Sequence, residues 1–93
     1  IITLLVILPS TLANVNGKCS YGRKGICIAT GTCKNYGGSP SNGNCPKDAS
    51  NIKCCENIPC KHEGKSGICR FTNECSGTSN AGHCPGGNNF KCC

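Results

Sequence analysis

Hydrophobic positions form one long apolar run at the N-terminus and only short segments after it. The segments Ile26-Cys27-Ile28-Ala29 and Ile52-Lys53-Cys54-Cys55 carry β-branched residues and predict strands. Gly- and Asn-rich stretches at 35–43 and 78–82 predict turns, and Asn42-Gly43 suits a tight hairpin. No helical periodicity extends over a useful length, so we expect short strands and turns.

The apolar run Ile1–Leu8 is followed by Pro9 and small residues, which is the pattern of a signal peptide. Thr11 and Ala13 occupy the −3 and −1 positions of a cleavage after Ala13, so residues 1–13 are predicted to be part of a signal peptide. The run is far shorter than the roughly 20 residues of a membrane-spanning helix. The alternative is a hydrophobic segment that is retained and used in assembly.

The cysteines form two sets of six, and each set ends in an adjacent pair. They stand at positions 19, 27, 33, 45, 54 and 55, and again at 60, 69, 75, 84, 92 and 93. Gly25-Ile26-Cys27 matches Gly67-Ile68-Cys69, so the words between the cysteines repeat too. We predict a first module at 14–55, a linker at 56–59 and a second module at 60–93. Because each module can close its own cysteines, we expect independent folding units without a shared core.

Composition limits the size of any core. Among 93 residues, 12 are Cys, 4% are aromatic, and Met and Trp are absent. Domains this small usually need disulfides or metals, because the area buried on folding barely offsets chain entropy. Adjacent cysteines favour disulfides over a zinc cluster, whose ligands are usually spaced apart. Cysteine at this density is typical of an oxidising compartment, so we predict a secreted, extracellular protein.

The cysteine frame resembles that of the β-defensins. Each module has six cysteines, a terminal CC, a Gly two residues before the second and fourth cysteines, and a Lys before the CC. These residues are Gly25, Gly43, Lys53, Gly67, Gly82 and Lys91. The resemblance supports a fold class of small disulfide-rich protein with two tandem modules, each a short three-stranded antiparallel β-sheet with three disulfides.

Six cysteines allow fifteen pairings, so connectivity comes from the resemblance alone. The β-defensin pattern implies bonds from the first to the fifth, the second to the fourth and the third to the sixth cysteine. The implied pairs are Cys19–Cys54, Cys27–Cys45, Cys33–Cys55, Cys60–Cys92, Cys69–Cys84 and Cys75–Cys93. A competing cystine-stabilised α/β scaffold needs C-x-x-x-C and C-x-C spacings, and neither occurs.

The motifs G-I-C-x-x-T-x-x-C and N-I-K-C-C are also similar to those of a small Cys-rich module. That module precedes lysozyme-like or peptidase domains in some secreted wall-degrading proteins. This second resemblance implies targeting to microbial walls, whereas the first implies killing of microbes.

The net charge of +6 is shared unevenly between the modules. The second module sets Lys61, Lys65, Arg70 and Lys91 against two acidic residues, whereas the first has six basic residues against Asp48 alone. The six candidates for binding an anionic surface are Lys18, Arg23, Lys24, Lys34, Lys47 and Lys53. A basic side chain near a charged bilayer contributes about 1 kcal/mol before screening. The alternative is a solvated surface that maintains solubility.

Aromatic residues are candidates for sugar stacking, since their faces pack on pyranose rings. Tyr21, Tyr36 and Phe71 are the candidates for such a platform. The alternative is core packing, which we expect for Phe90 because it takes the place of Ile52 in the repeat.

Catalytic chemistry is not indicated. His62, His83 and Glu63 lie only in the second module and form no metal or acid–base motif, so we predict no catalytic residue, metal site or cofactor. A nucleic-acid partner would need a denser basic stripe with interleaved aromatics. We predict a secreted cationic defensin-like protein that acts on anionic microbial membranes or cell walls. The alternatives are a non-catalytic wall- or carbohydrate-binding module and a self-assembling extracellular structural protein.

Overall fold

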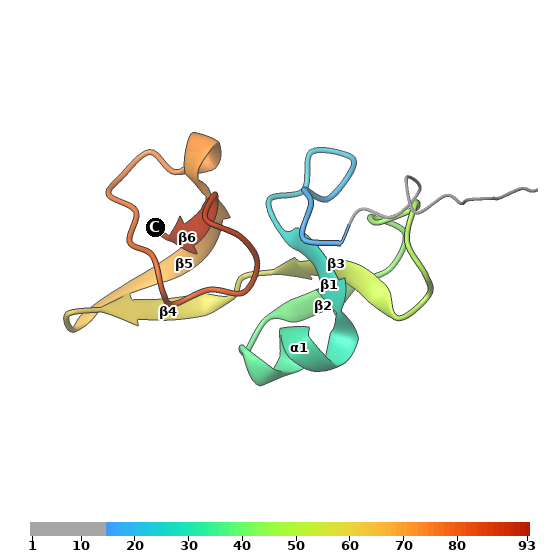
Figure 1. The fold of residues 1–93 in the computed structure, drawn as a ribbon, viewed down its shortest axis with the longest axis horizontal. Helices are drawn as coiled ribbons and strands as arrows, with labels where there is room; N and C mark the ends of the chain where they lie inside the picture. The colour runs from blue at the N-terminus through green and yellow to red at the C-terminus, as the bar shows by residue number, and fades with distance from the viewer. Residues whose placement is uncertain (1–14) are drawn as a thin grey trace, which may run out of the picture.

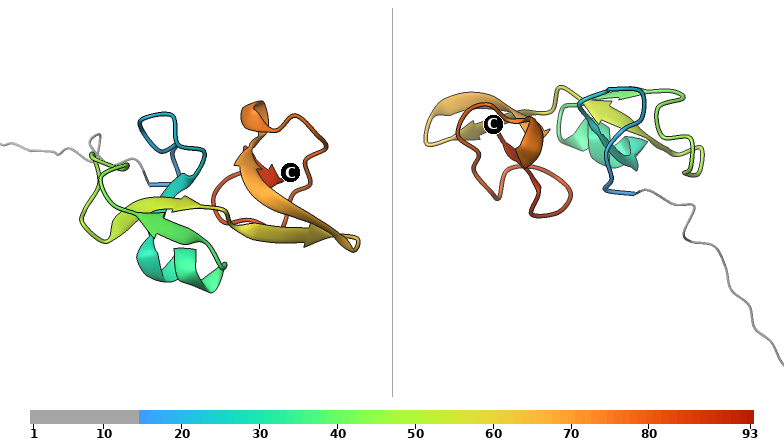
Figure 2. Two further views of the ribbon diagram at one scale, coloured as in Figure 1. Left: turned by 180° about the vertical axis from the view of Figure 1, so that it is seen from behind. Right: turned by 90° about the horizontal axis from the view of Figure 1, so that it is seen from above.

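The computed structural model describes residues 15–93, so the predicted signal segment at 1–13 lies outside the described residues. It contains two three-stranded antiparallel sheets that lie side by side (Figures 1 and 2). The first has the order β1 (Ile26–Ala29), β3 (Ile52–Glu56), β2 (Ser39–Ser41). The second has the order β4 (Pro59–His62), β5 (Lys65–Phe71), β6 (Phe90–Cys92). The predicted fold class is confirmed.

Strands β1 and β3 are the two segments that β-branched residues predicted, and they pair with each other. Cys27 lies opposite Cys54, and Ile28 lies opposite Lys53. The second sheet has the same register at the matching positions, with Cys69 opposite Cys92. The first pair of adjacent cysteines lies within the central strand β3, whereas in the second sheet Cys92 ends the edge strand β6 and Cys93 follows it.

The glycine of each repeated G-I-C motif, Gly25 or Gly67, lies where the backbone passes close to that of the terminal CC. A Cβ atom added at Gly25 would lie 2.2 Å from the carbonyl oxygen of Cys55, and one at Gly67 would lie 2.3 Å from that of Cys93. A backbone carbonyl cannot move aside as the end of a flexible side chain can, so a Cβ atom does not fit at this distance. Each position therefore requires glycine for the same reason, the passage of the chain against the terminal CC.

A short helix that the hydrophobic pattern did not predict follows β1. Helix α1 (Thr30–Asn35) buries only Cys33, so it is too short to produce an amphipathic pattern. It ends in a Schellman arrangement, because the Gly38 N–H donates to the Cys33 carbonyl (2.9 Å) and the Gly37 N–H to that of Lys34 (3.0 Å). Gly37 has φ of +82°, which suits glycine at this cap. The 3-10 helix η2 (Thr72–Glu74) follows β5 in the corresponding place.

The expectation of a tight hairpin at Asn42-Gly43 is wrong. Gly43 does turn the chain, with φ of +80°, but β2 pairs with β3 through Ser41 and Cys54, so residues 42–51 form a long loop. This loop carries Cys45 to its disulfide partner Cys27 on β1. Part of the stretch predicted as turn is the strand β2, whose Pro40 is tolerated because β2 is an edge strand.

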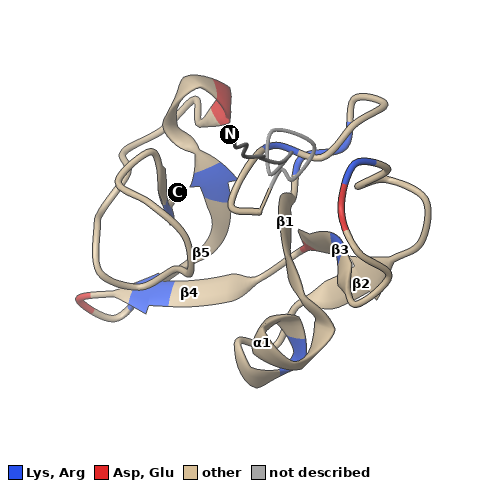
Figure 3. Cartoon of the chain, turned by 45° about the vertical axis from the view of Figure 1, so that its right-hand side comes forward, with Lys and Arg blue, Asp and Glu red and all other residues tan. Residues whose placement is uncertain are grey.

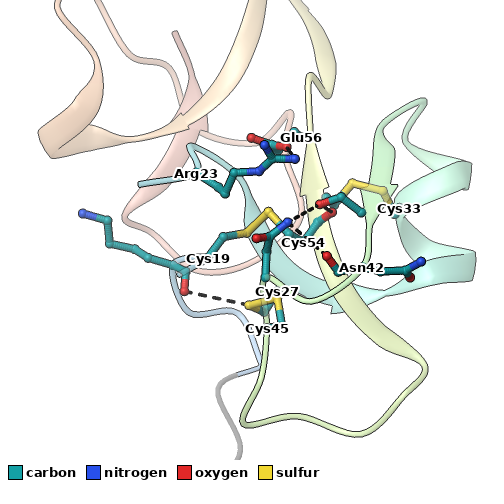
Figure 4. The surroundings of a disulfide bond; sticks show 12 residues. Cys19, Arg23, Cys27, Cys33, Asn42, Cys45, Cys54 and Glu56 are labelled. Carbon is teal, nitrogen blue, oxygen red and sulfur yellow. Dashed lines mark hydrogen bonds and ion pairs between the residues drawn. A yellow bond between two sulfur atoms is a disulfide. The ribbon is translucent and has the colours of Figure 1, made fainter. Parts of the chain in front are cut away.

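Six disulfides connect all the cysteines. The pairs are Cys19–Cys54, Cys27–Cys45, Cys33–Cys55, Cys60–Cys92, Cys69–Cys84 and Cys75–Cys93. These are the pairs that the β-defensin resemblance implied, and every bond stays within one module. Cys19, Cys27, Cys45 and Cys54 form a buried cluster in the first module (Figure 4).

The expectation of independent units without a shared core is also wrong. One buried cluster joins residues of both modules: Ile26, Ile28, Cys33, Cys55, Ile58, Cys69, Phe71 and Phe90. Ile58, in the predicted linker, is only 1% exposed, and its carbonyl accepts a hydrogen bond from the Cys69 N–H (2.9 Å). Neither module has enough large apolar residues to bury on its own, so combining them increases the buried area.

The contact between the modules is close. A Cβ atom at Gly86 would lie 2.6 Å from Cδ1 of Ile26, so the loop between η2 and β6 packs directly on β1. The rings of Phe71 and Phe90 meet edge to face, with centroids 4.8 Å apart.

Among the helices of residues 15–93, none has the length and apolar character that a membrane-spanning helix needs.

Candidate cationic surface

Two of the predicted surface-binding residues lie in ion pairs. Lys18 Nζ is 3.3 Å from Glu74 Oε2, at the second module, and 5.9 Å from the centroid of the Phe71 ring. Arg23 is 3.2 Å from Glu56 Oε1, at the end of β3 (Figure 4). These cations are partly neutralised where they stand, and the Lys18 pair connects the two modules. Both basic side chains are nearly half exposed, so the pairs add little to stability.

The remaining predicted cations of the first module lie on different elements. Lys53 Nζ donates to Asn42 Oδ1 (2.6 Å), which holds it against the long loop. Lys24, Lys34 and Lys47 are exposed on the loop before β1, on α1 and on the loop before β3. Figure 3 shows the basic positions spread around the first sheet and not gathered at one place. The first module therefore presents separate charges without one continuous patch.

A more coherent set of basic residues lies on the second sheet. Arg70 of β5 stands directly opposite Lys91 of β6, and Lys61 of β4 stands opposite Ser66. Opposite residues share a face, and so do alternate residues along β5, so Lys61, Arg70 and Lys91 project from one face of the sheet. The buried side chains of Cys69 and Phe71 occupy the other face. We call Lys61, Arg70 and Lys91 the basic face; Figure 3 shows basic residues on β4 and β5.

The basic face lacks compensating charge. Strands β4, β5 and β6 contain no Asp or Glu. Within residues 15–93, no carboxylate forms a salt bridge with any of the three basic side chains. Like charges directly opposite one another destabilise an antiparallel pair, and an external anion between Arg70 and Lys91 would relieve that repulsion. The net charge of each module did not predict this face, because a sum of charges does not record the side of the sheet on which each charge lies.

The predicted stacking platform is not formed. Phe71 is only 2% exposed in the shared core, so its ring cannot lie against a sugar. Tyr21 and Tyr36 are 75% and 42% exposed. Tyr21 belongs to the loop before β1 and Tyr36 caps α1, and these segments lie at opposite ends of the first sheet (Figure 1). The expected core position of Phe90 is confirmed, since it is 3% exposed.

His62 and His83 are 21 residues apart in the sequence, but their side chains are in contact in the structure. His62 at the end of β4 has Nδ1 2.9 Å from Nε2 of His83, and the rings meet edge to face. Glu63 Oε2 is 3.8 Å from the other nitrogen of His62. The neighbouring Cys84, bonded to Cys69 of β5, brings His83 to this place. The position of His83 next to Cys84 was the only feature of the sequence that could have indicated this pair of histidines.

Close groups of cysteine sulfurs are not available for metal binding. Cys19, Cys27 and Cys45 lie within 4.8 Å of one another, as do Cys60, Cys69 and Cys84. Every one of these sulfurs is in a disulfide, so none is a thiolate ligand.

No protein-family model matches the chain, and no solved structure does. The chain is similar to an uncharacterized secreted protein of Arthroderma benhamiae, with 45% identity over 84 residues. The similar region covers 87% of this chain and 33% of that protein, so the chain spans about a third of the length of its curated relative. The predicted extracellular localisation is confirmed by this relative, in agreement with twelve oxidised cysteines.

Proposed function

We propose that this is a secreted, cationic, defensin-like protein that binds anionic polymers or lipids at microbial surfaces. The observation that carries the proposal is the basic face of the second sheet, where Lys61, Arg70 and Lys91 share one side of three strands without an acidic residue. The net charge of +6 extends the attraction beyond contact distance. The β-defensin resemblance adds support, because the six disulfides follow its pairing.

Adsorption is favoured over insertion into a bilayer. Among the described residues, the only exposed large hydrophobic side chains are those of Val15, Tyr21 and Tyr36. Membrane-inserting proteins bury an apolar face several ångströms into the bilayer, and three scattered residues do not form one. Binding should therefore depend mainly on charge, with the lysine and arginine side chains meeting phosphate or carboxylate groups.

Vesicle binding tests this proposal. We expect the protein to sediment with vesicles that contain anionic phosphatidylglycerol and with a purified anionic wall polymer, but not with neutral phosphatidylcholine vesicles. Raising the salt concentration from about 0.01 M to about 0.15 M shortens the screening length from about 30 Å to about 8 Å, so binding should weaken strongly. Equal binding to neutral and anionic vesicles, or indifference to salt, would contradict an electrostatic function.

Two further readouts separate the alternatives. Dye leakage and growth inhibition would accompany binding if the protein kills, whereas wall-polymer binding without either would indicate a targeting module. Analytical ultracentrifugation of the unbound protein tests self-assembly, which predicts species that grow with concentration.

A further inference from the structure

We infer that His62 and His83 form a binding site for a divalent transition-metal ion of the Zn²⁺ or Cu²⁺ type. The two ring nitrogens that face each other, Nδ1 of His62 and Nε2 of His83, are 2.9 Å apart. They are the only two histidines in the chain. Neutral imidazole is the ligand that these ions prefer at sites without thiolate.

The separation of the nitrogens suits a metal ion after a small movement. Two imidazoles bound to Zn²⁺ at about 2.0–2.1 Å with tetrahedral angles have their nitrogens about 3.3 Å apart. The observed pair therefore needs to open by only a few tenths of an ångström. In the absence of metal one nitrogen donates its N–H to the other, which keeps the two nitrogens together. Metal binding requires His83 to carry its proton on Nδ1 instead and the rings to tilt, so that both facing nitrogens present a lone pair to the ion.

Glu63 lies near the outer nitrogen of His62, although beyond hydrogen-bond distance, where histidine ligands commonly have a carboxylate partner. Its Oε2 lies 3.8 Å from Nε2 of His62, the nitrogen that faces away from His83. A ligating histidine usually donates its second N–H to a carboxylate, which fixes the tautomer and makes the ring a better ligand. With Nε2 protonated toward Glu63, Nδ1 of His62 is left free to coordinate.

The backbone holds both histidines in place before any ion binds. Glu63 and Gly64, which connect β4 to β5, have φ of +49° and +82°, as in a type I′ hairpin turn that fixes the end of β4. The Cys60–Cys92 and Cys69–Cys84 disulfides anchor β4 and the loop of His83 to the same sheet. A preorganised pair of ligands loses little side-chain entropy on binding.

A recess lies beside one of the two ligands. His62 and Glu63 line it together with polar residues such as Thr78 and Asn80, and its volume is about 410 Å³. Both histidines are only half-buried, so water can reach an ion between them and complete its coordination. Lys65 lines the same recess, and its positive charge opposes a cation, so binding should be weaker than at a four-ligand structural zinc site.

Titration of the secreted, disulfide-bonded protein with ZnCl₂ and with CuCl₂ tests the site. We expect one saturable site per chain by calorimetry, with affinity lowered at least tenfold by His62→Gln or His83→Gln. Because Glu63 is exposed and lies beyond hydrogen-bond distance, Glu63→Gln should weaken binding by less than the roughly 10–100-fold that loss of a bonded outer partner costs. Lys34→Gln, on α1 in the first module, is the matched control and should leave affinity unchanged.

A measurement on the wild-type protein covers the case in which a histidine variant does not form its disulfides. In NMR spectra, added Zn²⁺ should shift the ring signals of both histidines with a single dissociation constant. No saturable binding at millimolar metal, a shift of only one ring, or unchanged affinity in a folded His83→Gln variant would overturn the inference.

Discussion

Replacing Cys33 and Cys55 together by alanine is expected to lower the free energy of unfolding by about 3–5 kcal/mol. Their disulfide closes a sequence separation of 22 residues, for which loop-closure entropy alone gives about 3 kcal/mol. Both residues are also fully buried in the cluster that joins the two modules, so the substitution removes two packed sulfur atoms as well. Guanidinium denaturation of the otherwise oxidised protein measures the change.

The matched control is the Cys75→Ala, Cys93→Ala double variant. That bond closes a similar separation of 18 residues, but both of its cysteines are partly exposed. Its cost should therefore stay near the loop-closure value of about 3 kcal/mol, below that of the buried pair. Equal costs for the two variants would mean that the buried sulfurs contribute nothing to the core.

The second large effect is expected at Ile58, where alanine should cost about 2–5 kcal/mol. A flexible linker between independent units would tolerate this change. In the structure, however, the Ile58 side chain is 1% exposed and belongs to the cluster that contains Phe71 and Phe90. Because the cluster is shared, we also expect both modules to unfold in a single cooperative transition.

Val15→Ala provides the control for Ile58→Ala. Val15 is 51% exposed, so its truncation should change stability by less than about 0.5 kcal/mol. Calorimetry of the wild-type protein should show one transition. Two separate transitions, or an Ile58→Ala cost as small as that of Val15→Ala, would restore the picture of independent modules.

The cysteine frame carries most of the information that the sequence holds about this fold. The repeated glycine and the terminal CC occupy matching places in both modules, since Gly25 and Gly67 each pass against a CC carbonyl. The resemblance, not spacing, supplied the pairing. Strands rich in β-branched residues, such as β1, could be recognised because their pattern is local.

Features that depend on contacts distant in the sequence could not be predicted. Ile58 occupies a short Pro-containing connector, and only the tertiary fold shows that both modules close over it. Phe71 was a candidate for stacking because an exposed and a buried phenylalanine have the same sequence pattern. Helix α1 is stabilised by a glycine cap and the Cys33–Cys55 bond, neither of which produces a hydrophobic period.

The basic face could not be predicted from the sequence either. Net charge pointed to the first module, yet Lys18 and Arg23 are paired with Glu74 and Glu56. The basic face emerges only from the register that sets Arg70 opposite Lys91. Charge counts treat all basic residues alike, whereas the field at a surface depends on which strand face carries them.

The proposed binding surface is tested by comparing two triple variants that lower the net charge by the same three units. One replaces the basic face, Lys61, Arg70 and Lys91, by glutamine. The other replaces Lys18, Arg23 and Lys53, which contact Glu74, Glu56 and Asn42.

At low salt, we predict that the basic-face variant loses roughly a hundredfold in affinity for anionic phosphatidylglycerol vesicles, at about 1 kcal/mol for each basic side chain removed. The second variant should lose much less. Equal losses in the two variants would mean that net charge alone matters, and unchanged binding by the basic-face variant would contradict the proposed surface.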